Sequence, residues 1–123
     1  MILVDTSVWV DHLQRGNKAL ADSLAQGQVL AHPFVVGELA LGSLKQRASV
    51  LEALQFLPAA TVATDAEVLG FITTHALHGI GIGYVDAHLL AAARLTPGTR
   101  LWTLDKRLQA AASELDLAFS LNH

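Results

Sequence analysis

Met1-Ile2-Leu3-Val4-Asp5 is the stretch that decides the fold class of this chain. Four consecutive apolar residues, ended by an acidic one, predict a short strand that is buried on both faces, as strands are in a parallel sheet. Apolar residues then recur at helical spacing from Ser7 to Arg15, and Gly16 ends that segment. We therefore expect a buried strand that leads directly into a helix.

The alternation of strand and helix continues through the rest of the sequence. Further strands are predicted at residues 28–32, 59–62, 100–104 and 117–121, and further helices at 18–25, 33–41, 45–56, 64–77, 85–95 and 106–115. Strands that alternate with helices favour an α/β fold with helices on both faces of a parallel sheet. We expect one domain over residues 1–123, a three-layer α/β/α sandwich with a central parallel sheet of about five short strands.

The composition limits the chemistry that the chain can perform. Its 123 residues include no cysteine, which excludes disulfides, thiolate catalysis and iron–sulfur ligation. No apolar run reaches the length of about 18 residues that a membrane-spanning helix needs, so we expect a cytoplasmic protein. Hydrophobic residues make up 52% of the sequence and charged residues only 15%, which is more apolar surface than so small a domain can bury. We expect part of that surface to contact a partner.

The net charge does not by itself indicate a nucleic-acid partner. The chain has 8 Lys and Arg against 11 Asp and Glu, whereas many nucleic-acid binders carry a basic excess. If four of the acidic residues are neutralised in a metal site, the remaining charges are close to balance. The charge count therefore weighs against a nucleic-acid partner without excluding one.

Four acidic residues are placed to meet at one edge of the predicted sheet. Two of them end strands, and the other two lie near the beginning of helices that leave from the same edge. Ligands of open parallel sheets bind at the carboxyl ends of the strands, where such loops and helix ends converge. The four residues are Asp5, Glu38, Asp86 and Asp105.

The surroundings of these acids favour a metal site. Glu38 lies in a helix that is apolar nearly all round, so we expect it to be buried, and Asp86 has apolar neighbours. Unpaired carboxylates are costly in such places, and clustering adds repulsion. One or two Mg²⁺ or Mn²⁺ ions would neutralise them and would also bind a substrate phosphate. We therefore predict hydrolysis of a phosphodiester, with Thr6, Ser7 and Thr103 orienting the carboxylates.

Each acid also has a purely structural interpretation. Asp5 or Thr6 can serve only to cap the first helix, and Asp105 can do the same for the last. Asp86 lies in a first helical turn, where the helix dipole favours a carboxylate whatever its function. A structural Glu38 would need a nearby Arg or Lys, which the surrounding sequence does not supply. All four structural interpretations holding together is much less probable than any one alone.

Four segments, in order, resemble the PIN-domain family. Val4-Asp5-Thr6-Ser7-Val8-Trp9 resembles the opening of PIN domains, and the glutamate of Val36-Gly37-Glu38-Leu39 resembles their second acid. Asp86-Ala87-His88-Leu89-Leu90-Ala91-Ala92-Ala93 resembles the helix of the third acid, and Thr103-Leu104-Asp105-Lys106-Arg107 the element of the last one. The resemblance spans nearly the whole chain, and its short length is similar to that of VapC toxins from type II toxin–antitoxin systems.

The resemblance implies a fold, an activity and partners. It implies helices around a parallel sheet, magnesium- or manganese-dependent endoribonuclease activity, homodimers, and inhibition by a cognate VapB-like antitoxin. Asp5, Glu38 and Asp86 match the family's acidic positions and are expected to be catalytic and to ligate metal. Asp105 matches the last acid, which is expected to act directly on the metal or through water.

Two other functions are open on the residues alone. The first is a PIN-like module that holds RNA or a protein without cutting, although such a module has no need of four costly acids. The second is a phosphatase that uses Asp5 as its nucleophile, as in haloacid-dehalogenase-like enzymes. That chemistry wants another aspartate two residues later, where this sequence has Ser7.

Overall fold

The opening apolar run forms the central strand of the sheet. The structure, a computed structural model, describes residues 1–121. Strand β1 (Ile2–Val4) pairs in parallel with β2 (Val29–Leu30) on one side and with β3 (Arg100–Trp102) on the other. All three residues of β1 are buried, as expected for a central strand of a parallel sheet. The predicted α/β fold with a parallel sheet is confirmed.

The prediction of about five strands is wrong, since residues 1–121 form three. The segments predicted at 59–62 and 117–121 each add one isolated parallel bridge, Ala31 to Ala59 and Leu101 to Ala118. The first segment stops pairing because the amide of Thr61 donates to the side chain of Thr96 rather than to a strand carbonyl. These segments extend the sheet at its two edges without becoming strands.

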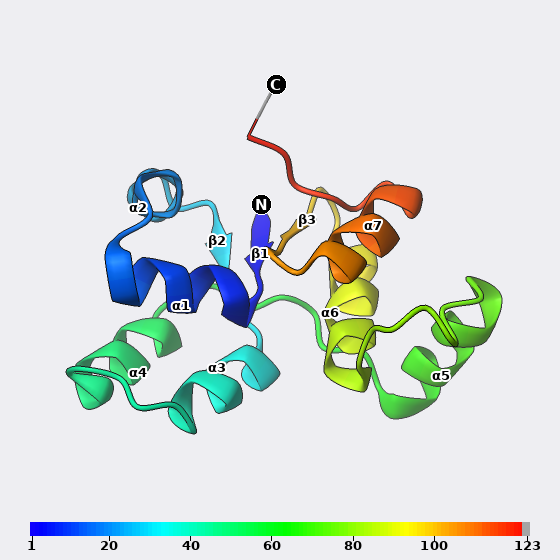
Figure 1. Cartoon of the computed structure of the whole chain (residues 1–123), viewed down its shortest axis with the longest axis horizontal. Coiled ribbons are helices and arrows are strands. Elements are labelled where there is room, and N and C mark those ends of the chain that lie inside the picture. Colours follow the sequence, from blue (N-terminus) through cyan, green and yellow to red (C-terminus); the bar gives the residue numbers. More distant parts are fainter. Residues whose placement is uncertain (122–123) are drawn as a thin grey trace.

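Helices lie on both sides of the strands. Figure 1 shows α1 to α4 on the side of β2 and α5 to α7 on the side of β3. In the first group α1 contacts α2 and α3, and α3 contacts α4. In the second group α6 contacts both α5 and strand β3. The helices are α1 (Thr6–Arg15), α2 (Lys18–Ala25), α3 (Pro33–Ala40), α4 (Arg47–Gln55), α5 (Asp65–Thr74), α6 (Tyr84–Leu95) and α7 (Lys106–Glu114).

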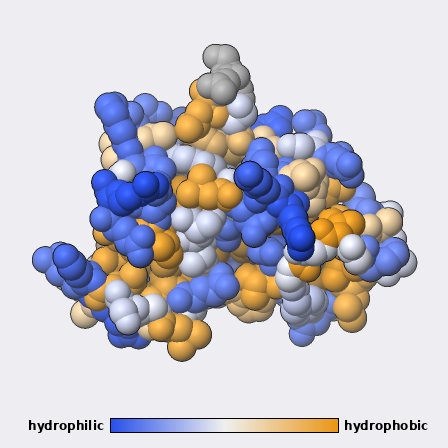
Figure 2. All heavy atoms as spheres, in the orientation of Figure 1, coloured by the Kyte–Doolittle hydropathy of each residue, from blue (hydrophilic) through white to orange (hydrophobic). Residues whose placement is uncertain are grey.

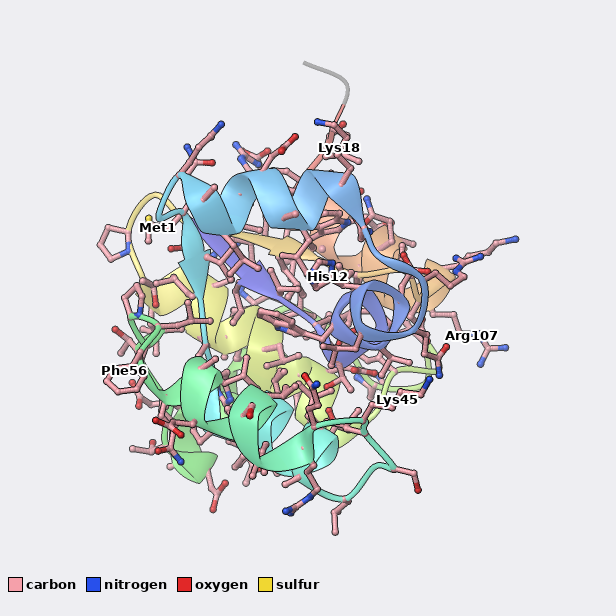
Figure 3. The ribbon with its side chains drawn as sticks, turned by 90° about the vertical axis from the view of Figure 1, so that its left-hand side faces the viewer. Met1, His12, Lys18, Lys45, Phe56 and Arg107 are labelled. Carbon is pink, nitrogen blue, oxygen red and sulfur yellow. The ribbon has the colours of Figure 1, made fainter. Side chains whose placement is uncertain are left out.

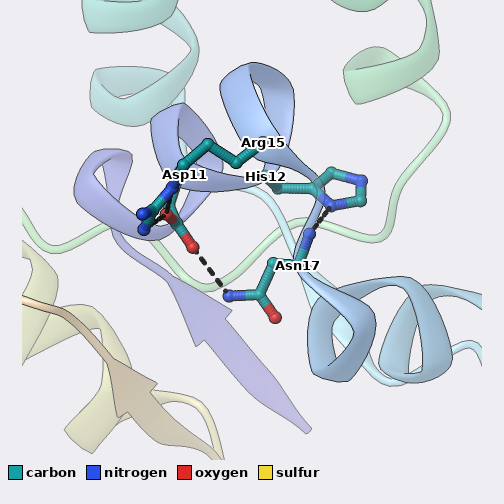
Figure 4. A network of polar contacts seen from close by, with 4 residues as sticks. All are labelled: Asp11, His12, Arg15 and Asn17. Carbon is teal, nitrogen blue, oxygen red and sulfur yellow. Dashed lines mark hydrogen bonds and ion pairs between the residues drawn. The ribbon is translucent and has the colours of Figure 1, made fainter.

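Local signals fix where several helices begin. The predicted capping box of α5 is present, since the Thr64 hydroxyl accepts from the Glu67 amide and the Glu67 carboxylate accepts from the Thr64 amide. At the corner between α1 and α2, the Asn17 side chain caps α2 and also donates to Asp11. Figure 4 shows this corner, where Asp11 accepts from the Arg15 side chain and the backbone amide of Asn17 donates to His12 Nδ1. The contacts hold α1 and α2 at a sharp turn.

Helix α6 forms the wall between the sheet and α5. Seven consecutive residues, Ala87 to Ala93, are buried, so this helix has almost no exposed face along its middle. Its small alanine side chains allow close packing against α5, while Leu89 and Leu90 are completely buried. Asp86 lies in the first turn of this tightly packed helix. Among residues 1–121 no helix is long and apolar enough to span a bilayer.

Candidate active site

Asp5 is the most enclosed of the four predicted acids. It follows β1 directly and is 7% exposed. Its Oδ2 accepts hydrogen bonds from Ser7 Oγ at 2.8 Å and from Thr103 Oγ1 at 2.7 Å. The Asp5 side chain makes no capping hydrogen bond to α1, so the interpretation of Asp5 as only a helix cap is wrong.

Glu38 is exposed, and the expectation that it is buried is wrong. Helix α3 turns Val35 and Leu39 into the core, which leaves the side of the helix that carries Glu38 facing outwards. The Thr6 hydroxyl, at the first residue of α1, donates to Glu38 Oε1 at 2.7 Å. This bond joins the first turn of α1 to α3, and it uses the side chain of Thr6 for Glu38 rather than for a cap.

Asp86 is close enough to the other three acids to be affected by their charges. Its Oδ2 accepts from the Gly83 amide at 3.0 Å, in the glycine-rich turn before α6. Partial burial raises the pKa of the Asp86 carboxyl above its usual value of 3.8, and the negative charges of Asp5, Asp105 and Glu38 raise it further. Each of the other three carboxylates therefore lies close enough to Asp86 to repel it.

Asp105 caps α7, as its structural interpretation predicted. Its Oδ1 accepts from the amides of Arg107 at 2.9 Å and Leu108 at 3.0 Å. The Asp105 amide donates in turn to Thr103 Oγ1, the hydroxyl that also holds Asp5. The cap uses only one of the two carboxylate oxygens, so capping and a second role are compatible.

The four carboxylates have one feature in common. In each, one oxygen accepts a hydrogen bond from a hydroxyl or a backbone amide, and the other oxygen has no hydrogen-bond partner among residues 1–121. An acid fixed through one oxygen and open at the other is prepared to bind a cation. The arrangement is still open, since no group of three or more His, Asp or Glu side chains in the described part of the chain is already arranged to hold a metal ion.

Comparison with known proteins places this arrangement in a family. The sequence model of the PIN domain matches residues 2–114, which include all four acids. The chain belongs to the PIN-domain family. Its resemblance to that family, expected from the four short segments, is thereby confirmed over nearly the full length.

Individual PIN-domain proteins are similar to this chain in sequence and in structure. Ribonuclease VapC32, from two strains of Mycobacterium tuberculosis, is 48% identical over 120 residues, which cover 98% of this chain and 97% of the relative. The crystal structure of FitAcB from Neisseria gonorrhoeae contains a chain that is 25% identical, with a TM-score of 0.64, and the match covers 96% of this chain and 95% of that one. The PIN domain described above therefore has a full-length likeness to a VapC ribonuclease.

The sequence did not reveal a buried histidine pair in this PIN domain. His32 and His88 are almost completely buried, and the ring of Phe34 packs edge-on against both, at centroid distances of 5.2 and 4.6 Å. Tyr84 also packs edge-on against His88, at a centroid distance of 4.7 Å, and donates its hydroxyl to Asp65. The spacing of Tyr84 and His88, four residues apart on α6, was the available signal, but it does not show which partners fill the cluster.

Proposed function

We propose that this chain is a magnesium- or manganese-dependent endoribonuclease, the toxin of a type II toxin–antitoxin system, with one nuclease domain over residues 1–123. Two of these residues, 122 and 123, lie outside the part that the structure describes. The observation that carries the proposal is a set of four carboxylates, each with one open oxygen, three of which lie close enough to Asp86 to raise its pKa, in a PIN domain similar to a VapC ribonuclease. RNA as substrate also implies action in the cytoplasm.

Asp5, Glu38, Asp86 and Asp105 would hold the cation. The donor set fits a hard divalent ion, because it offers oxygen alone and carries the negative charge that such an ion neutralises. A bound Mg²⁺ or Mn²⁺ would polarise the phosphoryl group and lower the pKa of the attacking water. Thr6, Ser7 and Thr103 would keep the carboxylates in place during that reaction.

The burial of Asp86 and the negative charges near it support this role. A raised pKa shows that the folded protein disfavours the ionised carboxyl, which is a cost that a structural acid would not need to bear. A cation near the four acids would remove the cost and draw their open oxygens together. The proposal therefore explains why the chain keeps an acid at position 86, where a neutral residue would be more stable.

The test is cleavage of a mixed-sequence RNA by the purified protein. EDTA should abolish cleavage, and added Mg²⁺ or Mn²⁺ should restore it. Asp86→Asn should remove cleavage, whereas Asp22→Asn, on the exposed face of α2, should leave it unchanged. Full cleavage in EDTA would show that the acids do not work through a metal. Metal-dependent RNA binding without cleavage would favour the non-cutting module instead.

We also propose two partners, a second copy of this chain and a VapB-like antitoxin. Apolar side chains remain exposed in the first half of the chain, with Leu41 91% and Phe56 82% exposed, and the face shown in Figure 2 has apolar side chains among the polar ones. A hollow of about 170 Å³ between α1, α2 and α4 is lined largely by apolar residues, Trp9 and Leu24 among them. The molar mass in solution tests for the homodimer, and a monomer at micromolar concentration would contradict it.

The antitoxin should compete with the metal. We expect it to bring an Arg or Lys that pairs with the four acids, so that added Mg²⁺ at constant ionic strength weakens its binding. A protein with Asp5, Glu38 and Asp86 replaced by amides should lose this magnesium dependence. The same magnesium response in both proteins would show that inhibition does not involve the carboxylates.

A further inference from the structure

Most of the basic side chains are paired within the molecule. The chain has 8 Lys and Arg, and five of them bind a carboxylate or a backbone carbonyl. The other three, Lys45, Lys106 and Arg107, have no ion pair or side-chain hydrogen bond to any residue of 1–121. Two of these three are neighbours and directly follow Asp105.

Arg107 differs from an ordinary exposed arginine because its side chain lies against the backbone of Gly81. A methyl group added to Gly81 would lie 2.8 Å from Arg107 Cδ and 3.0 Å from Cζ, and closer still to Nη1. Gly81 also has a φ of +87°, a conformation that other residues adopt only with strain. The glycine therefore provides both the turn and the space in which the arginine rests.

Arg107 is connected to the segments that carry two of the four acids. Gly81 belongs to the turn whose Gly83 amide holds Asp86, and Arg107 is two residues beyond Asp105. Arg107 is thus linked to the Asp86 turn through its contact with Gly81, and to Asp105 through the first turn of α7. Figure 3 shows Arg107 at the edge of the molecule, with the end of its side chain directed away from the body.

Neither the dipole of α7 nor an internal ion pair accounts for the position of the Arg107 charge. Lys106 and Arg107 are the first two residues of α7, where the positive end of the helix dipole disfavours cations. Arg107 does not serve as a counter-ion for the acids either, because no carboxylate oxygen in residues 1–121 lies within ion-pair distance of its guanidinium. An arginine that is held in place, unpaired and unfavourable to its own helix is suited to bind an external anion.

We propose that Arg107 is a substrate-positioning residue that binds a backbone phosphate of the RNA. This phosphate is the neighbour of the one that is cleaved at the four acids. The inference rests on the proposed ribonuclease function. The planar guanidinium can donate two parallel hydrogen bonds to one phosphate, which fixes the direction of the strand as well as its distance. It also supplies positive charge that the overall composition lacks.

The first experiment measures binding of a short, mixed-sequence, single-stranded RNA by fluorescence anisotropy. All proteins carry Asp86→Asn, so that the RNA stays intact in the presence of Mg²⁺. Arg107→Gln should weaken binding about tenfold and reduce the slope of log affinity against log salt by about 0.7, the value for one phosphate on a single strand. Lys18→Gln removes the same charge from α2, at another edge of the molecule in Figure 3, and should change neither quantity.

The second experiment tests the glycine. Gly81→Ala should displace the Arg107 side chain and weaken RNA binding, but it should have little further effect in a protein that already carries Arg107→Gln. Gly98→Ala is the matched control, because Gly98 also has a positive φ, of +71°, and no atom near the added methyl group. It should leave RNA binding unchanged. Additive losses from the Gly81 and Arg107 substitutions would overturn the assigned contact.

Kinetics separate this inference from the function on which it rests. With Asp86 intact, Arg107→Gln should raise KM with a smaller effect on kcat, as expected for a binding contact. If the wild-type protein cuts RNA and Arg107→Gln leaves both KM and RNA affinity unchanged, the inference is wrong while the ribonuclease function stands. If the wild-type protein neither binds nor cuts RNA with any metal, the proposed function fails, and the inference fails with it.

Discussion

The hydroxyl of Thr103 donates a hydrogen bond to Asp5 Oδ2 over 2.7 Å, and it accepts one from the amide of Asp105. One side chain thereby connects two acids that are 100 residues apart in the sequence. Since Thr103 is buried, its bond to Asp5 is protected from water.

Thr103→Val should therefore reduce both stability and activity. The loss leaves Asp5 short of a donor in a buried place, so the free energy of unfolding should fall by about 1–3 kcal/mol. RNA cleavage should fall by about 10- to 100-fold because Asp5 is less well oriented. Urea titration and cleavage rates measure the two effects. Thr99→Val is the control, since Thr99 is equally buried but its hydroxyl has no hydrogen-bond partner in residues 1–121, and its removal should not destabilise the protein.

Asp86→Asn should stabilise the metal-free protein at neutral pH. The folded-state pKa of Asp86 lies above the unfolded value of 3.8, so ionisation costs stability as pH rises through the range above 3.8. The asparagine variant does not incur this cost, and its carbonyl can still accept from Gly83. The advantage of the variant in melting temperature should therefore grow with pH in EDTA. Added Mg²⁺ should raise the melting temperature of the wild-type protein more than that of the variant. An equal rise in both would show that Asp86 is not a principal ligand.

His32→Asn should reduce the fall in the free energy of unfolding that weak acid causes. Burial lowers the pKa of His32 to about 4, with a further lowering by the nearby His88. In the unfolded chain His32 has its ordinary pKa of 6.5 and binds a proton below that pH, whereas in the folded chain it stays neutral. The free energy of unfolding therefore falls as the pH drops from 6.5 towards about 4. This accounts for at most about 3 kcal/mol of the loss. Asparagine can keep the cap that His32 Nδ1 provides to the Phe34 amide. Unfolding free energies of both proteins across this range measure the difference, and parallel curves would contradict the assignment.

Glu38→Gln and Thr6→Val should affect cleavage to different degrees. The glutamine can still accept from the Thr6 hydroxyl but has lost its charge, so cleavage should fall by more than about a hundredfold. The valine removes only the bond that orients Glu38, and the loss should stay within about tenfold to a hundredfold. Because Glu38 is exposed, neither variant should unfold more readily by more than about 0.5 kcal/mol. The reverse order of activities would mean that Thr6, and not Glu38, acts at the reaction centre.

The sequence predicted what depends on local pattern. The apolar run before Asp5 indicated a buried central strand, and the capping box at Thr64 indicated the start of a helix, and both are present. The same logic brought the four acids to one edge of the sheet, because strand ends and helix starts converge there whatever the details of packing. The shared influence on the Asp86 pKa agrees with that placement.

The predictions that failed concern burial and pairing. Glu38 was expected inside because its helix neighbours are apolar, but α3 is too short and too near the surface to bury all its sides. The segments at 59–62 and 117–121 have strand-like residues, yet each finds only one residue of a neighbour in register. The position of Arg107 over Gly81 was equally hidden, since nothing in the spacing of 26 residues shows that the two touch. Burial, strand pairing and contacts of this kind depend on how separate helices, strands and turns pack in three dimensions.

The central strand is synthesised before either of its neighbours. The bond between Thr103 and Asp5 spans 98 residues, and β3 pairs with β1 across almost the same length of chain. A ribosome that has translated only as far as residue 99 has made three of the four acids, but neither β3 nor Thr103, which supplies one of the two hydroxyls that donate to Asp5. Pairings of such long range also form slowly. Prematurely terminated products of this gene should therefore be harmless to the cell, and nuclease activity should arise only as translation nears its end.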